Sequence, residues 1–403
     1  MNRAIYLKKG REASIKRFHP WIFSGAVAQK EGAPADGDVV DVYGADGDYL
    51  ATGHYQEGSI TVRILSFTGP GLPDDFWISS LREAFALRKR LGLCGEKDAP
   101  TTAYRLVHGE GDHLPGLVID FYGGVAVMQA HSAGMFLSRT AIVEALKVVY
   151  GDHLLAVYDK SAATAPFKAG LSLENSYLYQ SPSYDLTRLT RLTVLEGGNR
   201  FLPDHELGQK TGLFLDQREN RALLGQMANG ARVLNLFAYS GGFSVYALEG
   251  GASLVHSVDS SQRAIDLLHK NIALNFESDN RHEAFVADAF DFLKASPKGA
   301  YNMMVLDPPA FAKHTDAKRS ALQAYKRLNA LAFDRIAPGG ILFTFSCSQV
   351  VDKNEFALAV FSAAAISGRQ VKILYRLTQA PDHPVSIYHP EGEYLKGLIV
   401  YVR

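Results

Sequence analysis

The chain has 403 residues, of which 47% are hydrophobic and 21% are charged, as in ordinary globular proteins. This composition excludes disordered, collagen-like and coiled-coil proteins, and at roughly 150 residues per domain the length predicts two or three domains. The formal net charge is zero, and two cysteines are too few for a disulfide framework, which indicates a reducing compartment. The sequence starts without an apolar run of signal-peptide length and contains no stretch of about 20 apolar residues. We therefore expect a cytoplasmic protein with no membrane contact.

The zero net charge hides an uneven distribution. Residues 1–30 carry seven Lys and Arg against the single acid Glu12, and residues 31–50 carry six acids and no base. Such a field can steer an anionic polymer, although a solvated face is an equal interpretation. His19, Trp21 and Phe23 follow the basic cluster and could stack on unpaired bases, but a Trp in a small β domain is more often a core residue.

The first part of the chain alternates short strands and turns. Strands are expected at 4–7, 38–43, 48–53 and 60–67, which fits a small β barrel or sandwich. A Gly- and Pro-rich linker covers 68–73. An amphipathic helix at 75–92, strands at 104–107, 117–121 and 125–130, and a helix at about 135–150 then predict an α+β region.

From about residue 230 the pattern changes to buried strands that alternate with helices. The expected strands are 233–237, 254–258, 284–287, 302–306 and 340–345, each followed by a helix. Two late strands at 370–376 and 396–402 have only a loop between them and can pair antiparallel. Continuous apolar strands in such alternation are typical of a parallel sheet covered on both faces, which binds ligands beyond the carboxyl ends of its strands.

Three of these strand ends suggest a nucleotide-like ligand. Gly241 and Gly242 follow the first strand and allow the backbone to approach a ligand. Asp259 ends the second strand, where an acid can accept from both ribose hydroxyls of an adenosine, and Asp288 follows the third, in reach of an adenine amino group. The loop lacks the G-x-G-x-x-G spacing, which disfavours NAD.

The next two strand ends carry the reactive groups. Asp307 precedes Pro308 and Pro309, which stiffen the backbone and could present the acid to a planar base. Cys347 follows the fifth strand, and Asp352 and Glu355 have the spacing of a capping box for the next helix, whose dipole would favour a thiolate.

The other candidate groups are of lesser weight. A structural role is expected for Cys94, and the spacing of His, Cys and acids shows no metal site. The polar stretch at 209–220 is either a loop with a helix cap or a lid over a cofactor.

Six motifs occur in a fixed order: KTGLFLDQREN (210–220), NLFAYSGGF (235–243), VDSS (258–261), ADAF (287–290), LDPPAF (306–311) and FSCS (345–348). In this order they resemble the Rossmann-like S-adenosylmethionine-dependent methyltransferases, and more narrowly the bacterial large-subunit ribosomal RNA cytosine-C5 methyltransferases. HPWIFSGAV (19–27) is similar to the PUA domain of that family, and YRLVHGEGDHLPGLVID (104–120) to its middle domain.

The resemblance implies an α/β fold with three domains: a PUA-like RNA-binding domain at 1–70, an α+β middle domain at 74–190, and a Rossmann-like seven-stranded methyltransferase domain at 191–403. It implies S-adenosylmethionine as cofactor and ribosomal RNA, of the large subunit, as partner, and leaves a homodimer open. Cys347 would be the nucleophile and Asp307 would hold the pyrimidine. The residues that would bind or cover the cofactor are Thr211, Asp216, Gln217, Phe237, Tyr239, Gly241, Asp259 and Asp288.

Three other functions stay open. A uracil-C5 methyltransferase shares the single-cysteine arrangement, because Ala310 stands where some cytosine enzymes have a second Cys. A guanine methyltransferase on the same scaffold needs no thiol. A non-catalytic RNA-binding factor of ribosome assembly could keep the cofactor pocket without turnover.

Overall fold

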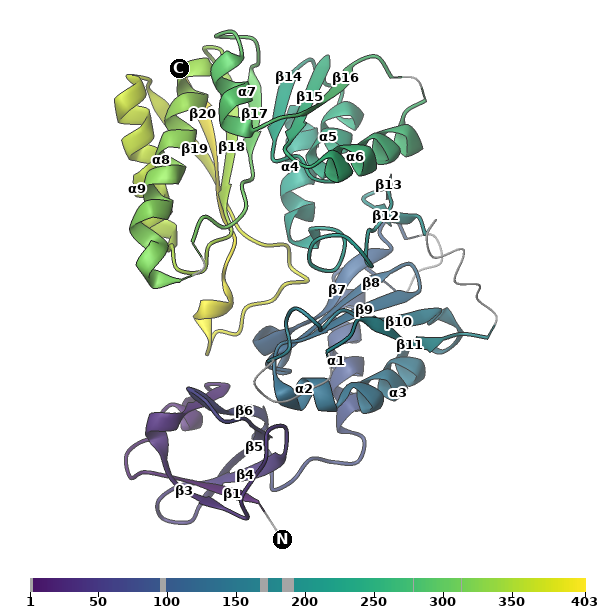
Figure 1. Cartoon of the computed structure of the whole chain (residues 1–403), viewed down its shortest axis with the longest axis vertical. Coiled ribbons are helices and arrows are strands. Elements are labelled where there is room, and N and C mark those ends of the chain that lie inside the picture. The colour runs from purple at the N-terminus through teal and green to yellow at the C-terminus, as the bar shows by residue number, and fades with distance from the viewer. Residues whose placement is uncertain (1–2, 95–98, 167–172, 183–191, 278, 313) are drawn as a thin grey trace. The chain divides into compact units, whose positions relative to one another are not determined.

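The computed structural model describes residues 3–94, 99–166, 173–182, 192–277, 279–312 and 314–403 (Figure 1). The chain forms two compact units. The first contains residues 1–195, 203–215 and 381–392, and the second contains residues 196–202, 216–380 and 393–403. The chain therefore passes between the units several times. The domain boundary expected at 190/191 lies outside the described residues.

The N-terminal part of the first unit is a small β domain. Its six-stranded sheet has the order β2-β6-β5-β4-β1-β3, in which only β1 and β4 are a parallel pair. The apolar residues of alternate strand positions, among them Ile5, Val42 and Val62, are fully buried in its core. The strands are β1 (Ala4–Leu7), β2 (Trp21–Phe23), β3 (Val27–Glu31), β4 (Val39–Tyr43), β5 (Tyr49–Tyr55) and β6 (Ile60–Ser66).

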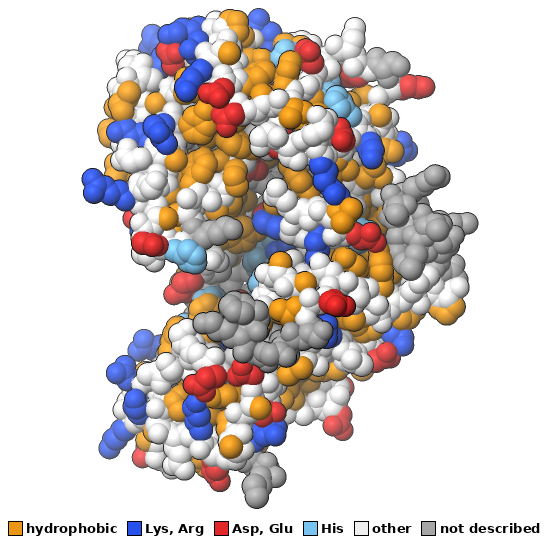
Figure 2. Space-filling model, viewed as in Figure 1, with side chains coloured by type: hydrophobic (Ala, Val, Ile, Leu, Met, Phe, Trp, Pro, Cys, Tyr) orange, Lys and Arg blue, Asp and Glu red, His pale blue; other side chains and the backbone are white. Residues whose placement is uncertain are grey.

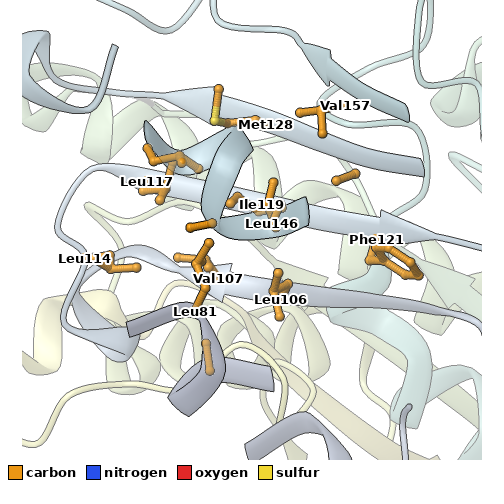
Figure 3. Packing of buried hydrophobic residues seen from close by; sticks show 14 of the residues in the cluster. Leu81, Leu106, Val107, Leu114, Leu117, Ile119, Phe121, Met128, Leu146 and Val157 are labelled. Carbon is orange, nitrogen blue, oxygen red and sulfur yellow. The ribbon is translucent and has the colours of Figure 1, made fainter. Parts of the chain in front are cut away.

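A five-stranded sheet of order β11-β10-β9-β8-β7 forms the rest of the first unit, with helices packed on it. Figure 3 shows its core, where Leu81 of α1 and Leu146 of α3 meet Leu106, Ile119 and other strand residues. The elements are α1 (Phe76–Arg90), β7 (Ala103–His108), β8 (Leu117–Tyr122), β9 (Val125–Ala130), α2 (Ala133–Leu137), α3 (Arg139–Tyr150), β10 (Ala156–Asp159) and β11 (Ser176–Gln180).

Two buried ion pairs lie in this part of the first unit. Arg105 on β7 donates to both carboxylate oxygens of Asp120 on β8 at 2.8 Å, and both side chains are almost fully buried. Arg88 on α1 makes a similar pair with Asp112. Asp382, from the distant segment 381–392, accepts from the backbone N–H of Arg105 at 2.9 Å, and its carbonyl accepts from Arg88 at 2.8 Å. These bonds fix the segment 381–392 to the first unit.

The second unit is built on a seven-stranded sheet of order β16-β15-β14-β17-β18-β20-β19, as the resemblance implied. Strands β14 to β18 are parallel, and β20 pairs antiparallel with both β18 and β19, as expected from the loop that joins the last two strands. The strands are β14 (Arg232–Leu236), β15 (Leu254–Asp259), β16 (His282–Val286), β17 (Met303–Leu306), β18 (Gly340–Ser346), β19 (Val371–Leu377) and β20 (Lys396–Val402).

Two groups of helices cover this sheet, α4–α6 on one face and α7–α9 on the other (Figure 1). They are α4 (Arg218–Met227), α5 (Gly242–Glu249), α6 (Gln262–Asn275), α7 (Ala289–Ala295), α8 (Lys318–Arg335) and α9 (Lys353–Ser367). The strand order reverses at β14, whose neighbours are β15 and β17. Ligands of such sheets bind beyond the carboxyl ends of the strands at this switch point.

The structure corrects several expectations. The helix expected at 135–150 is two helices, because the Ser132 hydroxyl caps a short α2 and the chain bends at Ser138 before α3. Strands β2, β3, β10 and β11 were not expected. A short two-stranded sheet, β12 (Val194–Glu196) with β13 (Asn199–Phe201), was also missed. These strands are short or mixed in polarity, so that an alternating pattern does not mark them.

Among the described residues, no helix is long and apolar enough to span a bilayer. Over the same residues, no cluster of three or more His, Cys, Asp or Glu side chains could hold a metal ion.

We expect Asp120→Asn to lower the free energy of unfolding by about 3–5 kcal/mol, because it leaves the Arg105 guanidinium buried without its counter-charge. Urea unfolding followed by circular dichroism measures the loss. Asp152→Asn is the matched control, since Asp152 is exposed in the same unit and should change stability by less than about 0.5 kcal/mol. Equal effects of the two substitutions would show that the buried Arg105–Asp120 pair adds nothing to the free energy of unfolding.

Candidate active site

The turn after β14 has an unusual backbone. Phe237 and Tyr239 have φ angles of 60° and 45°, which side-chain-bearing residues seldom adopt, and Gly241 has a φ of 81°. A Cβ atom at Gly241 would lie 2.6 Å from Cγ of Leu268, so that only glycine fits before α5. Strain of this kind costs about 1–3 kcal/mol per residue and is typical of ligand-binding turns.

Asp259 connects this turn to the next strand end. One carboxylate oxygen accepts from the backbone N–H of Tyr239 at 2.9 Å, and the other accepts from the N–H of Ser261 at 2.9 Å. Each oxygen has a second lone pair that a ligand hydroxyl can use. Asp259 is therefore placed at the sheet's switch point, and it also holds the strained turn in shape.

Asp288 is the exposed N-cap of α7. Its Oδ1 atom accepts from the N–H groups of Phe290 and Asp291 at 2.9 and 3.1 Å. Its Oδ2 atom accepts from no described residue, so that this oxygen can face the amino group of a ligand.

The ends of β17 and β18 bring the two reactive motifs together. Leu306 and Thr344 are register partners, and the chain continues from them to Asp307 and Cys347. The Sγ atom of Cys347 lies 3.9 Å from the carbonyl oxygen of Pro308. Asp307 and Cys347 are both half-buried, so that each is held by the fold and is still open to a ligand.

Polar side chains pack behind Cys347. The Ser348 hydroxyl accepts from the backbone N–H of Ala312 at 3.3 Å and lies 3.2 Å from the hydroxyl of Tyr325. The Nζ atom of Lys396 donates to the Ser348 carbonyl at 2.5 Å. Burial lowers the pKa of Lys396 to about 8, against an opposing effect of the Cys347 thiol and nearby acids. Lys396 is not among the residues predicted for the site, although a Lys directly before the apolar run GLIVYV (397–402) is unusual.

Asp216 and Gln217 stand at the start of α4. Oδ2 of Asp216 accepts from the Tyr394 hydroxyl at 2.6 Å, and its backbone carbonyl accepts from Ala380 at 2.9 Å. Oε1 of Gln217 accepts from Asn220 at 2.6 Å, while its buried Nε2 atom has no hydrogen-bond partner among the described residues. A buried amide donor without a partner costs about 1–3 kcal/mol, which favours an acceptor on a ligand.

Thr211 has a different environment from the other predicted site residues. It is fully buried in the first unit, where its hydroxyl donates to Asp120 and lies 3.2 Å from the Tyr122 hydroxyl. The other predicted site residues all belong to the second unit. Phe237 is half-buried there against the apolar core.

This fold and this arrangement of strand ends define an S-adenosylmethionine-dependent methyltransferase. The family model of that description matches residues 157–390, and a model described as a PUA-like domain matches residues 5–67. The chain is 41% identical over 410 residues to the ribosomal RNA large subunit methyltransferase I of Aeromonas hydrophila, covering all of both chains. It is 38% identical over 401 residues to that of Escherichia coli, covering 98% of each.

The chain therefore belongs to the ribosomal RNA large subunit methyltransferase I family. Its fold is similar to that of a solved structure from Streptococcus mutans described as a SAM-dependent methyltransferase, with a TM-score of 0.82, 24% identity and complete coverage of both chains. A second solved structure, a methyltransferase in complex with SAH, has a TM-score of 0.81 and 24% identity over the same coverage.

We expect Asp259→Ala to weaken S-adenosylmethionine binding by about 1–3 kcal/mol, because the variant lacks a charged hydrogen-bond acceptor. Isothermal titration calorimetry measures the dissociation constant. Asp266→Ala, an exposed acid on the neighbouring helix α6, is the control and should leave it unchanged. An unchanged constant for Asp259→Ala would remove this residue from the cofactor site.

Proposed function

We propose that this protein forms 5-methylcytosine in large-subunit ribosomal RNA, with Cys347 as the nucleophile and Asp307 as the residue that holds the pyrimidine. The observation that carries the proposal is the approach of Cys347 Sγ to the Pro308 carbonyl at 3.9 Å. It brings a half-exposed thiol and the Asp307 motif to adjacent ends of two parallel strands. The relatives named as ribosomal RNA large subunit methyltransferases support the substrate class.

The residues present fit the cofactor. The buried Nε2 atom of Gln217 and the Oδ2 atom of Asp288, neither of which has a hydrogen-bond partner among the described residues, offer a donor and an acceptor for a ligand. Asp259 would accept from the ribose hydroxyls, and Phe237, Tyr239 and Gly241 would shape the turn. When bound, the cofactor supplies an electrophilic methyl group on a positively charged sulfur. Asp216 would cover the site from the start of α4, and a contribution of Thr211 stays a prediction.

Cys347 makes the chemistry possible because carbon 5 of cytosine is a poor nucleophile. When the thiolate adds to carbon 6, the electron pair of the carbon 5–carbon 6 bond makes carbon 5 nucleophilic toward the methyl group. Asp307 would hold the ring edge and stabilise the charge that develops there. A base then removes the carbon 5 proton, the double bond re-forms, and the electron pair of the carbon–sulfur bond returns to Cys347.

The N-terminal β domain offers a surface for the RNA. Arg3 pairs with Asp38 and Lys30 with Glu57. The other five cations of residues 1–30 form no ion pair in the described structure: Lys8, Lys9, Arg11, Lys16 and Arg17. Figure 2 shows Lys and Arg side chains on the outer surface of this part of the chain.

Aromatic residues follow these cations in the sequence. The rings of Phe18 and Phe23 are about half exposed, at 49% and 48%. Trp21, for which a core position was expected, is only half-buried, and its indole N–H donates to Glu110 at 2.9 Å. A basic cluster followed by exposed rings suits unpaired nucleotides, which a methyltransferase needs because the target base must leave its stack.

Cys347→Ala should abolish methylation and leave cofactor binding normal. Wild-type protein incubated with RNA that contains 5-fluorocytosine should form a methylated adduct that survives denaturation, because fluorine at carbon 5 cannot leave as a proton. Peptide mapping should find the adduct on Cys347. Cys94→Ala is the matched control and should still form the adduct with the RNA, since Cys94 is buried in the core of the first unit.

The outcomes separate the alternatives. Full methylation by Cys347→Ala would eliminate both pyrimidine C5 reactions and leave a guanine enzyme. Mass spectrometry of the product nucleoside distinguishes 5-methylcytosine from 5-methyluracil. No methylation of any ribosomal RNA by the wild-type protein, despite tight binding, would support the assembly factor.

Replacing Lys16 and Arg17 together by Gln should flatten the salt dependence of RNA binding. The slope of log K against log salt should fall by about 0.7–0.9 for each phosphate that the variant no longer neutralises. Fluorescence anisotropy with a ribosomal RNA fragment measures this slope. The charge-matched control replaces Lys89 and Arg90, two exposed cations of helix α1, and should leave the slope unchanged. Equal slopes for the two variants would assign Lys16 and Arg17 to a solvated face.

A further inference from the structure

Cys347 needs a source of positive charge if it is to react as a thiolate, and helix α9 does not provide it. The helix begins at Lys353, and the first-turn N–H groups of Asn354 and Glu355 donate to the Asp352 side chain, both at 2.8 Å. The expected capping box is therefore present. The Asp352 carboxylate lies at the positive end of the helix. Its negative charge offsets the helix dipole that was expected to favour the thiolate.

Lys396 provides a positive charge near the thiol. It is the register partner of Ser346, the residue before Cys347, and its ammonium group donates at 2.5 Å to the carbonyl of Ser348, the residue after Cys347. Its side chain is buried, and Cys347 and the nearby acids raise the pKa of Lys396 against the lowering effect of burial.

The acids around Lys396 have other cationic or N–H partners. Glu393 pairs with Lys353 at 2.5 Å, and Glu355 pairs with Lys318 at 2.5 Å. Asp352 is bound by the helix N–H groups. On α8, the buried Tyr325 also faces the thiol, and burial raises its pKa, so that it is neutral at physiological pH.

We propose that Lys396 is the counter-ion that holds Cys347 as a thiolate. The step is an ionisation beside a fixed cation: the S–H bond of Cys347 breaks, its electron pair stays on sulfur, and the proton passes to solvent water while Lys396 remains an ammonium group. The pair carries one positive charge before this step and is neutral after it, which suits a half-buried site. When Cys347 later leaves carbon 6, the same ammonium receives the returning negative charge.

This proposal rests on the proposed role of Cys347, and Lys396 is a positioning residue in it. The test is the rate of Cys347 alkylation by iodoacetamide against pH, in full-length protein carrying Cys94→Ala. The wild-type rate should reach half its maximum below pH ~8.5, the ordinary value for a thiol. Lys396→Met, which keeps the length and the apolar stem, should move this midpoint up by at least about one unit, an approximately tenfold slower reaction at pH 7.

Lys396→Arg should keep the low midpoint, because it keeps the charge, whereas a merely structural loss would not be rescued. The pH profile of methylation should move with the alkylation midpoint in Lys396→Met. A wild-type midpoint at or above pH ~8.5, or an unmoved midpoint in folded Lys396→Met, overturns the proposal. If the midpoint moves as expected but Cys347→Ala still methylates RNA, the Lys396–Cys347 ion pair is supported. The proposed function is then overturned instead.

Discussion

The register of β20 against β18 is the constraint on which the candidate site depends. Residues 393–396 enter this strand and make three contacts with different parts of the second unit. Tyr394 donates to Asp216 at 2.6 Å, Glu393 pairs with Lys353 at 2.5 Å, and Lys396 donates to Ser348 at 2.5 Å. A slip of one residue would turn every side chain of the strand to the other face. The antiparallel pairing therefore places the start of α4, the start of α9 and the end of β18 around one strand end.

Buried ion pairs hold several segments of the first unit in place, although its core is mostly apolar. The Arg105–Asp120 pair joins β7 to β8, and the Arg88–Asp112 pair joins α1 to the turn after β7. The loop segments 203–215 and 381–392 bind to these pairs through Thr211 and Asp382. Buried ion pairs contribute little net stability compared with apolar residues of the same volume, but they fix which groups must meet. Their role here is to give two distant segments a defined place.

The sequence predicted the second unit well because its signals are local. Buried apolar strands followed by helices specify a parallel sheet, and a parallel sheet brings the strand ends of Asp259, Asp307 and Cys347 to one edge whatever the details. The environment of Cys347 was not predictable in this way. Lys396 is far from Cys347 in the chain, and only the antiparallel register joins them. The helix dipole was a reasonable local inference, but the capping carboxylate of Asp352 counteracts it.

The late position of Asp382 in the chain has a consequence for synthesis on the ribosome. Arg88 and Arg105 emerge with their partners Asp112 and Asp120 close behind them, so that their charges are neutralised early. Asp382, which accepts from the backbone of Arg105, follows on the order of tens of seconds later at the usual rate of roughly 5–20 residues per second. During that interval the nascent first unit lacks the segment that completes it. Its final closure must wait until nearly the whole methyltransferase domain has been made, which couples the maturation of the two units.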